Sequence, residues 1–346
     1  MTPASLAVTI IVPMRNEERR IGRCLDSILD NDFDHSQLEI LVLDGRSTDR
    51  SRTIVMEHAA DCENIRILDN PLRNVSAALN IGIRNARGHI IIIMGAHAEY
   101  SRTYIKACLQ ELSASGADVV GGVLETRPGG QSNVAQAIAL MSQHPFGVGG
   151  SAFRTRQKSG VVDTVPYGAY RREVFDKVGF FNEQLVRNQD FEFNARVSTA
   201  GGKIFLSPRI NSCYYNVASL RALVLQAFNN GRWLPRMWVA SLESFRLRHA
   251  VPAVFVGGLL LSIVSGFFHK PFFLPAAFAF ALYSILVTIS AGLIARRRAG
   301  RFFIPLIASF VVHHMAYGAG TLAGFFAWRM TLPGIPLEPR PTSTRL

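Results

Sequence analysis

The sequence contains few cysteines, and none of them are paired at the spacing of a metal site. Its 346 residues include four, Cys24, Cys62, Cys108 and Cys213, which are scattered along the chain. The scatter excludes a zinc-finger framework and indicates reduced thiols, as in a cytosolic protein. Internal repeats, low-complexity segments and motifs of nucleic-acid readers are also missing. We therefore expect no nucleic-acid partner, despite a net charge of +12.

A cleavable signal peptide is also missing from the beginning of the sequence. The apolar segment Leu6–Pro13 is short, no basic region precedes it, and no small-residue cleavage site follows it. We therefore expect the first part of the chain to remain in the cytoplasm.

Long hydrophobic runs dominate only the last third of the chain. The mean hydropathy is +0.18, which is high for a soluble protein. Three runs, at residues 251–268, 272–295 and 302–328, have the roughly 20 residues that a membrane-spanning helix needs. His313 and His314 interrupt the third run. We predict three membrane helices in residues 250–330, and the alternative is a set of buried helices in a large soluble domain.

The positive charge is partly concentrated beside these runs. Arg296, Arg297, Arg298 and Arg301 fit a cytoplasmic loop between the second and third helices. Basic residues also outnumber acidic ones between Arg187 and Arg248. Such a segment is either a solvated face or a surface that contacts anionic membrane lipid and a diphosphate.

Strand and helix patterns alternate through the first hundred residues. Buried-strand patterns occupy residues 6–14, 38–45, 64–70 and 89–94, and helical patterns occupy residues 15–29, 47–60 and 75–88. This order predicts an α/β fold with a parallel sheet and right-handed crossovers. The loops that follow the strands, PMRNEE, DGRSTD, NPLRN and GAHAEY, carry the polar residues. Because ligands bind beyond the carboxyl ends of parallel strands, we expect the binding site at this edge.

Four segments in this order resemble a known enzyme family. Residues 8–30, 39–50, 70–100 and 161–206, including VTIIVPMRNEERRIGRCLDSIL, EILVLDGRSTDRS, NPLRNVSAALNIGIRNARG and YGAYRREVFDKVG, resemble inverting nucleotide-diphospho-sugar glycosyltransferases of family 2. The Ala-His pair and the three hydrophobic runs are most similar to the succinoglycan-type membrane glucosyltransferases of bacterial exopolysaccharide biosynthesis. The resemblance implies a Rossmann-like GT-A domain with a mainly parallel sheet in residues 1–215. An interfacial helical segment in residues 216–249, the membrane region and a Pro-rich tail at 331–346 would follow.

The resemblance also implies which residues bind the donor. Pro13, Arg15 and Glu17 would lie along the nucleotide base and ribose. Asp44, followed by Gly45, matches the acidic residue that hydrogen-bonds the nucleoside, and its alternative role is that of a turn residue.

Arg73 would face the diphosphate beside the positive end of the third helix. Its alternative is a solvated loop arginine.

The loop after the fourth strand departs from the family pattern. The family carries Asp-x-Asp there, which holds a divalent cation against the diphosphate, whereas this chain has Gly95, Ala96 and His97. We expect Ala96 and His97 to contact the donor, and we hypothesise that His97 and Glu99 hold a divalent metal. Imidazole suits Mn²⁺ better than Mg²⁺, which stays possible. The alternative is a metal-free site in which His97 hydrogen-bonds the sugar or the diphosphate.

Catalysis and acceptor binding are assigned to later segments. Asp190 matches the position of the family's catalytic base, and Gln189 replaces the neighbouring acid and would contact the acceptor. The alternative for Asp190 is the N-cap of the following helix. Arg232 and Trp233 resemble the end of the Gln-x-x-Arg-Trp acceptor motif. The alternative is an interfacial helix with the same amphipathic pattern.

The functional prediction is an inverting hexosyltransferase with a nucleotide-diphospho-sugar donor, UDP-linked in our interpretation. Its acceptor would be a lipid-linked saccharide at the cytoplasmic face of the bacterial inner membrane, in exopolysaccharide synthesis. Two alternatives stay open. One is a polyprenyl-phosphate sugar synthase, and the other is a catalytically degenerate protein that binds nucleotide-sugar or lipid.

Overall fold

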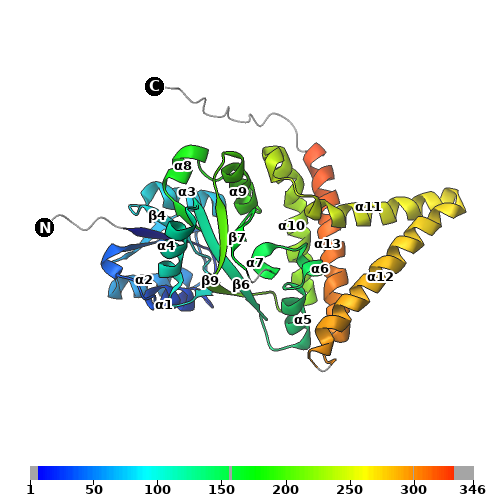
Figure 1. Cartoon of the computed structure of the whole chain (residues 1–346), viewed down its shortest axis with the longest axis horizontal. Coiled ribbons are helices and arrows are strands. Elements are labelled where there is room, and N and C mark those ends of the chain that lie inside the picture. Colours follow the sequence, from blue (N-terminus) through cyan, green and yellow to red (C-terminus); the bar gives the residue numbers. More distant parts are fainter. Residues whose placement is uncertain (1–6, 156–157, 299, 331–346) are drawn as a thin grey trace, which may run out of the picture.

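The computed structural model describes residues 7–155, 158–298 and 300–330, which form an α/β domain and a helical region (Figure 1). The predicted tail at 331–346 lies outside the described residues. The strands are β1 (Val8–Met14), β2 (Leu38–Asp44), β3 (Ile65–Asp69), β4 (Ile90–Ile93), β5 (Ala98–Tyr100), β6 (Val119–Arg127), β7 (Gly160–Val161), β8 (Ala169–Arg171) and β9 (Ile204–Tyr215). The helices of the α/β domain are α1 (Ile21–Leu29), α2 (Ser51–Asp61), α3 (Val75–Asn85), α4 (Tyr104–Ser115), α5 (Asn133–Met141), α6 (Pro145–Val148), α7 (Ala152–Thr155), α8 (Glu173–Val178) and α9 (Gln189–Thr199). The helical region contains α10 (Leu220–Ala240), α11 (Leu247–Phe268), α12 (Phe273–Arg296) and α13 (Phe303–Met330).

The sheet is parallel in its first half and mixed in its second. Its strand order is β3-β2-β1-β4-β8-β6-β9-β5, and β7 pairs with β9. The four predicted strands β1 to β4 pair in parallel. Strand β8 then runs antiparallel to both β4 and β6. The expectation of a mainly parallel sheet therefore applies only to the first half, because a strand of three residues such as β8 leaves no hydrophobic pattern in the sequence.

Helices cover both faces of this sheet and build two hydrophobic cores. Helix α1 buries the predicted face of Ile21, Cys24, Leu25 and Ile28, and α4 packs beside it. Helices α3, α8 and α9 cover the opposite face around Phe193. Each fully buried aliphatic or aromatic side chain contributes about 1.5–3 kcal/mol, so these two layers hold the strand ends in place.

The first two helices begin later than their sequence patterns suggest. The pattern predicts a helix from residue 15, but α1 begins at Ile21 because residues 15–20 form a turn in which Glu17 accepts hydrogen bonds from the backbone of Arg20 and Ile21. Helix α2 begins at Ser51 rather than residue 47. The residues before these two helix starts, 15–20 and 47–50, belong to loops of the site.

The helical region contains the three predicted hydrophobic helices. Within the described ranges, α11, α12 and α13 are long and apolar enough to cross a membrane. Helices α11 and α12 form a hairpin that extends away from the α/β domain (Figure 1). Their surface exposes large apolar side chains such as Leu261, Phe268 and Phe278. An apolar surface of this extent is typical of lipid contact.

Helix α13 differs from that hairpin because it packs along α10. A Cβ added at Gly231 of α10 would lie 2.1 Å from the carbonyl oxygen of Tyr317, and one added at Gly320 of α13 would lie 2.1 Å from that of Phe228. The glycines allow the two backbones to touch. Met237 and Trp238 of α10 are consequently buried in protein. The predicted interfacial segment therefore presents much of its apolar face to α13.

Candidate functional site

The loops after β1 and β2 are joined to each other by hydrogen bonds. The backbone N–H of Asn16 donates to Ser47 Oγ at 3.0 Å, and that of Glu17 donates to Ser51 Oγ at 2.7 Å. In return, the side chain of Asn16 accepts from the backbone of Thr48 at 2.8 Å. Together these bonds make one rigid rim from the two loops at the carboxyl edge of the sheet.

Backbone strain is concentrated at the same edge. Among the described residues, five non-glycine positions have positive φ: Asn16, Arg46, Arg73, Tyr167 and Asn188. The first three follow β1, β2 and β3, Tyr167 precedes β8 beside the end of β4, and Asn188 precedes α9. Such conformations cost about 1–3 kcal/mol each and cluster at functional sites. Their positions support a site at the predicted edge.

Asp44 is buried at the end of β2 and already has partners. Its Oδ1 accepts a hydrogen bond from the backbone of Ser47, and its Oδ2 pairs with Arg52 at 3.0 Å. Arg52 also pairs with Asp69 at 2.6 Å, and these two carboxylates raise the pKa of Arg52. Asp44 thus holds the loop in place, as a turn residue does. A nucleoside could only use the lone pairs of the Asp44 carboxylate that these two partners leave open. Arg52 was not predicted as a site residue, because in the sequence it is one polar residue of a helix.

His97 and Glu17 face each other across the rim. His97 Nδ1 lies 3.3 Å from Glu17 Oε1, and the His97 ring packs edge-on against Tyr214 at 5.6 Å between ring centroids. The structure therefore brings together two residues that the sequence assigned separately, one to the nucleotide and one to the metal. Exposed Arg73 follows β3 at this same edge.

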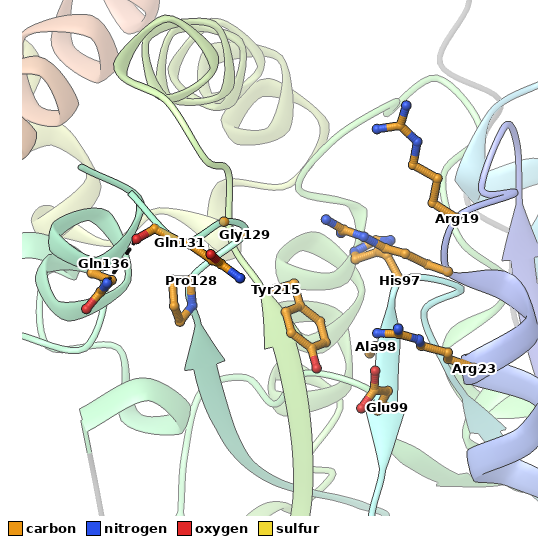
Figure 2. Close-up of a pocket in the computed structure, with 12 residues that line it drawn as sticks. Arg19, Arg23, His97, Ala98, Glu99, Pro128, Gly129, Gln131, Gln136 and Tyr215 are labelled. Atoms are coloured by element: carbon orange, nitrogen blue, oxygen red, sulfur yellow. Dashed lines mark hydrogen bonds between the residues drawn. The ribbon is translucent and has the colours of Figure 1, made fainter. Parts of the chain in front are cut away.

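A basic pocket of about 480 Å³ lies beside this pair. Figure 2 shows Arg19 and Arg23 on one wall, with Tyr215 and Gln131 opposite. Arg20 also lines the pocket, with its guanidinium 5.9 Å above the Tyr215 ring. Three arginines in one pocket favour an anionic ligand. They were missed because the run ERRIGR appeared to be the solvated face of a helix.

His97 and Glu99 both line this pocket, together with Ala98 between them. Within residues 7–155, 158–298 and 300–330, no three His, Cys, Asp or Glu side chains gather closely enough to hold a metal ion by themselves. The pair of side chains that comes closest to a metal-binding arrangement is the imidazole of His97 with the carboxylate of Glu17. Two such groups fit a divalent ion only if a bound ligand and water complete its coordination.

A side chain at position 95 would meet the ring of Tyr167. A Cβ built on Gly95 would lie 2.7 Å from Cε1 of Tyr167. The backbone N–H of Gly95 also donates to Tyr100 Oη at 2.6 Å, and the Tyr100 ring packs edge-on against Tyr167. The aromatic cluster occupies the space that the first family carboxylate would need.

Asp190 lies in the first turn of α9. The N-cap is Asn188, so the alternative that Asp190 caps the helix is wrong. Burial raises the pKa of Asp190, although hydrogen bonds from the Phe191 and Asp190 backbone N–H groups lower it in part. The pKa of Tyr170 is raised mainly by burial and further by the nearby charge of Asp190. Half-buried Gln189 precedes Asp190. Asp190 thus lies in the first turn of α9, two residues after Asn188, whose φ is positive.

Arg232 and Trp233 lie elsewhere, against α13. They line a separate small pocket together with Arg236, whose guanidinium lies 4.7 Å from the Trp233 ring centroid. Trp233 also packs against the buried cluster around Leu185 and Trp238. The structure does not place either residue in the basic pocket beside His97.

Comparison with known proteins adds three findings. The family model described as Glycosyl transferase family 2 matches residues 9–179. The "Dolichyl N-acetyl-alpha-D-glucosaminyl phosphate 3-beta-D-2,3-diacetamido-2,3-dideoxy-beta-D-glucuronosyltransferase" of Methanococcus voltae is 29% identical over 292 residues, 81% of each chain. The "Succinoglycan biosynthesis protein ExoA" of Rhizobium meliloti is 29% identical over 266 residues, 75% of this chain and 80% of the relative.

The fold also matches a solved structure, "Mannosyltransferase PcManGT from Pyrobaculum calidifontis in complex with GDP-Man and Mn2+". The TM-score is 0.56 at 19% identity, and the match covers 88% of this chain and 86% of that one. At this identity the similarity concerns the fold alone.

Proposed function

The chain carries a glycosyl transferase family 2 domain and is a glycosyltransferase, and from this premise we propose an inverting hexosyltransferase with a UDP-sugar donor and a lipid-linked saccharide acceptor. The observation that carries the proposal is the pairing of His97 with Glu17 on a rim beside a pocket lined by three arginines. Such a site combines hydrogen-bonding groups for a sugar nucleotide with positive charge for its diphosphate.

In this proposal the donor lies across the loops after β1, β2 and β4. Pro13, Arg15 and Glu17 contact the base and ribose, and Asp44 and Gly45 support the nucleoside from the second loop. The diphosphate then lies near Ala96, His97 and Arg73. The linking of the first two loops by the bonds of Asn16 and Ser47 supports this arrangement, because it presents their side chains without further ordering.

A divalent ion fits this site only if the bound donor and water complete its coordination. His97 and Glu17 would supply its protein ligands, in place of the predicted pair His97 and Glu99, since His97 and Glu17 lie 3.3 Å apart. The donor diphosphate and water would complete the coordination. Such an ion, Mn²⁺ before Mg²⁺, would neutralise charge on the departing diphosphate.

Asp190 acts as the general base in the proposed reaction. Its carboxylate removes the proton from the acceptor hydroxyl, whose oxygen then attacks the anomeric carbon. The bond from that carbon to the diphosphate oxygen breaks, and the nucleoside diphosphate leaves with the electron pair. Attack opposite the leaving group inverts the anomeric configuration. The burial that raises the pKa of Asp190 brings its basicity closer to neutral pH.

The relatives support the proposed acceptor. One is named for transfer to a dolichyl-phosphate-linked N-acetylglucosamine and another for succinoglycan biosynthesis. Three candidate membrane helices would hold this chain at a bilayer. We place the catalytic domain on the cytoplasmic face of a bacterial inner membrane, where lipid-linked saccharides for exopolysaccharides would be extended.

The test is a transfer assay with the purified full-length protein in detergent. A panel of nucleotide-sugars is supplied with membrane lipid extract, and released nucleoside diphosphate and lipid products are measured. We expect a new glycosidic bond of inverted configuration on an existing saccharide, and no product with Asp190→Asn. A lipid carrying a sugar monophosphate would instead identify a polyprenyl-phosphate sugar synthase. Absence of transfer from every donor would refute the proposed reaction.

A further inference from the structure

A cavity of about 610 Å³ separates the α/β domain from the hydrophobic helices. Helices α6 and α7 and strand β9 line one side, and α10, α11, α12 and α13 line the other. None of the residues predicted to bind donor or acceptor lines it. Polar side chains line one end of the cavity, and apolar side chains line the other.

Arg154 of α7 lies at the polar end of the cavity and has no acidic partner among the described residues. Its guanidinium donates to Thr126 Oγ1 at 2.8 Å and lies 5.5 Å from the ring centroids of Phe153 and Tyr214. No described carboxylate lies within ion-pair distance of it. Burial lowers the pKa of Arg154, as expected for a desolvated cation. The cavity's other arginine, Arg248, pairs with Asp163 at 2.6 Å, and Asp163 also pairs with Arg246 at 3.6 Å.

Two side-chain atoms at this end have no hydrogen-bond partner among the described residues. Ser151 Oγ and His313 Nδ1 are buried atoms without a partner among the described residues, and both side chains line the cavity. Ser151 is only 8% exposed. A hydroxyl and an imidazole can each donate a hydrogen bond. Since unpaired buried polar groups are costly, an uncompensated cation with two free donors indicates an anion carrying several oxygen atoms.

The apolar end opens between two of the candidate membrane helices. Phe255 of α11 and Leu282 and Leu286 of α12 line it. The two leucines are 47% and 42% exposed, although they belong to the cavity wall, so the wall continues onto the outer surface of the hairpin. A hydrocarbon chain in the membrane can therefore reach the cavity from this side.

The polar end is one aromatic ring away from the donor site. The ring of Tyr214 contacts the guanidinium of Arg154 and also packs against His97, 5.6 Å away. A headgroup bound to Arg154 would therefore lie next to the site proposed for the sugar nucleotide.

We propose that this cavity binds the phosphate-bearing end of the lipid acceptor, with Arg154 as the charge partner, Ser151 and His313 as hydrogen-bond donors, and the hairpin α11–α12 as the channel for the hydrocarbon chain. The inference rests on the proposed function, because it specifies that the saccharide acceptor is joined to its lipid through a phosphate or diphosphate. The apolar wall favours such an amphiphile over a soluble anion, which would use the polar end only.

The test measures binding of farnesyl diphosphate to the full-length protein in detergent, by calorimetry, with no nucleotide-sugar present. Loss of hydrogen bonds to a charged group predicts that Arg154→Met weakens binding roughly 10- to 100-fold. Arg154→Lys should retain part of the affinity. The control is Arg221→Met, which removes the same charge from an exposed position on α10. We expect it to bind like wild type.

A second variant tests the apolar end. Leu286→Asn should weaken the binding of farnesyl diphosphate and leave the affinity for inorganic diphosphate unchanged. Equal binding of farnesyl diphosphate by wild type and Arg154→Met would overturn the proposal. So would an Arg154→Met protein that loses UDP binding while keeping farnesyl diphosphate, because Arg154 would then belong to the donor site. Equal competition by phosphatidylglycerol would show a general anionic lipid site and would also overturn it.

The two proposals can fail separately. A wild-type protein that binds farnesyl diphosphate but transfers no sugar would refute the proposed reaction and leave the cavity assignment standing. A protein that transfers sugar to membrane lipid but does not bind farnesyl diphosphate would refute the cavity assignment alone.

Discussion

Replacing Gly95 with alanine should destabilise the α/β domain, although the backbone there is open to any residue. The new Cβ would lie 2.7 Å from Cε1 of Tyr167, and ordinary contacts begin near 3.4 Å. Withdrawal of the ring is opposed by Tyr100, which packs edge-on against it, while a hydrogen bond from Tyr104 Oη to the Tyr167 carbonyl at 2.6 Å holds the Tyr167 backbone. Overpacking of this kind costs about 1–3 kcal/mol. For a domain of this size, that lowers the melting temperature by about 2–12 °C.

Thermal unfolding of the detergent-solubilised protein measures the effect. Gly22→Ala is the matched control, since its Cβ would meet only ordinary contacts at 3.6 Å or more and α1 gains a better helix former. We expect that variant to melt at the wild-type temperature or above it. In a Tyr167→Ala background, Gly95→Ala should cost little, and a double-mutant cycle gives the coupling. An unchanged melting temperature for the single Gly95→Ala variant would refute the steric explanation.

The remaining predictions concern catalysis, metal use and the membrane region. Asp190→Asn should lower kcat by about 10²- to 10⁴-fold and leave the affinity for the donor nearly unchanged. Release of nucleoside diphosphate measures kcat, and calorimetry with UDP measures the affinity. A near-normal kcat would show that Asp190 is not the general base. Because the pKa of Asp190 is raised, transfer should fall as pH drops through that raised value, at higher pH than for an ordinary carboxyl. Burial disfavours the ionised form of Asp190 in the folded state. It therefore lowers the free energy of unfolding at pH values above the raised pKa, and this effect is lost below the pKa that Asp190 has in the unfolded chain. We accordingly expect Asp190→Asn to melt at a higher temperature than wild type at neutral pH. His97→Asp should keep activity and shift metal preference from Mn²⁺ toward Mg²⁺, whereas equal wild-type turnover with EDTA and with Mn²⁺ would make the site metal-free. A chain ending at residue 246 should aggregate on size-exclusion chromatography, because removal of α13 uncovers Leu223 and the apolar face of α10. A soluble monomeric peak would contradict that expectation.

The glycosyl transferase family 2 domain and the first half of the fold were predictable because their signals are local. The run Ile90–Ile93 is β-branched throughout and forms the expected buried strand β4. Helix α1 buries its predicted face, and the three hydrophobic runs form helices within a few residues of their expected limits. In each case the information lies in consecutive residues, whose periodicity directly reflects burial.

Tertiary structure alone decided the features that join distant segments. The obstacle to a side chain at Gly95 is the ring of Tyr167, and the partner of His97 is Glu17 from another loop rather than Glu99. Strand β8 is too short to leave a pattern, yet it reverses the sheet beside β4. Arg154 and His313 line one cavity from opposite sides of the domain boundary. No local pattern encodes such meetings, because packing between elements, and not the propensity of either segment, brings these side chains together.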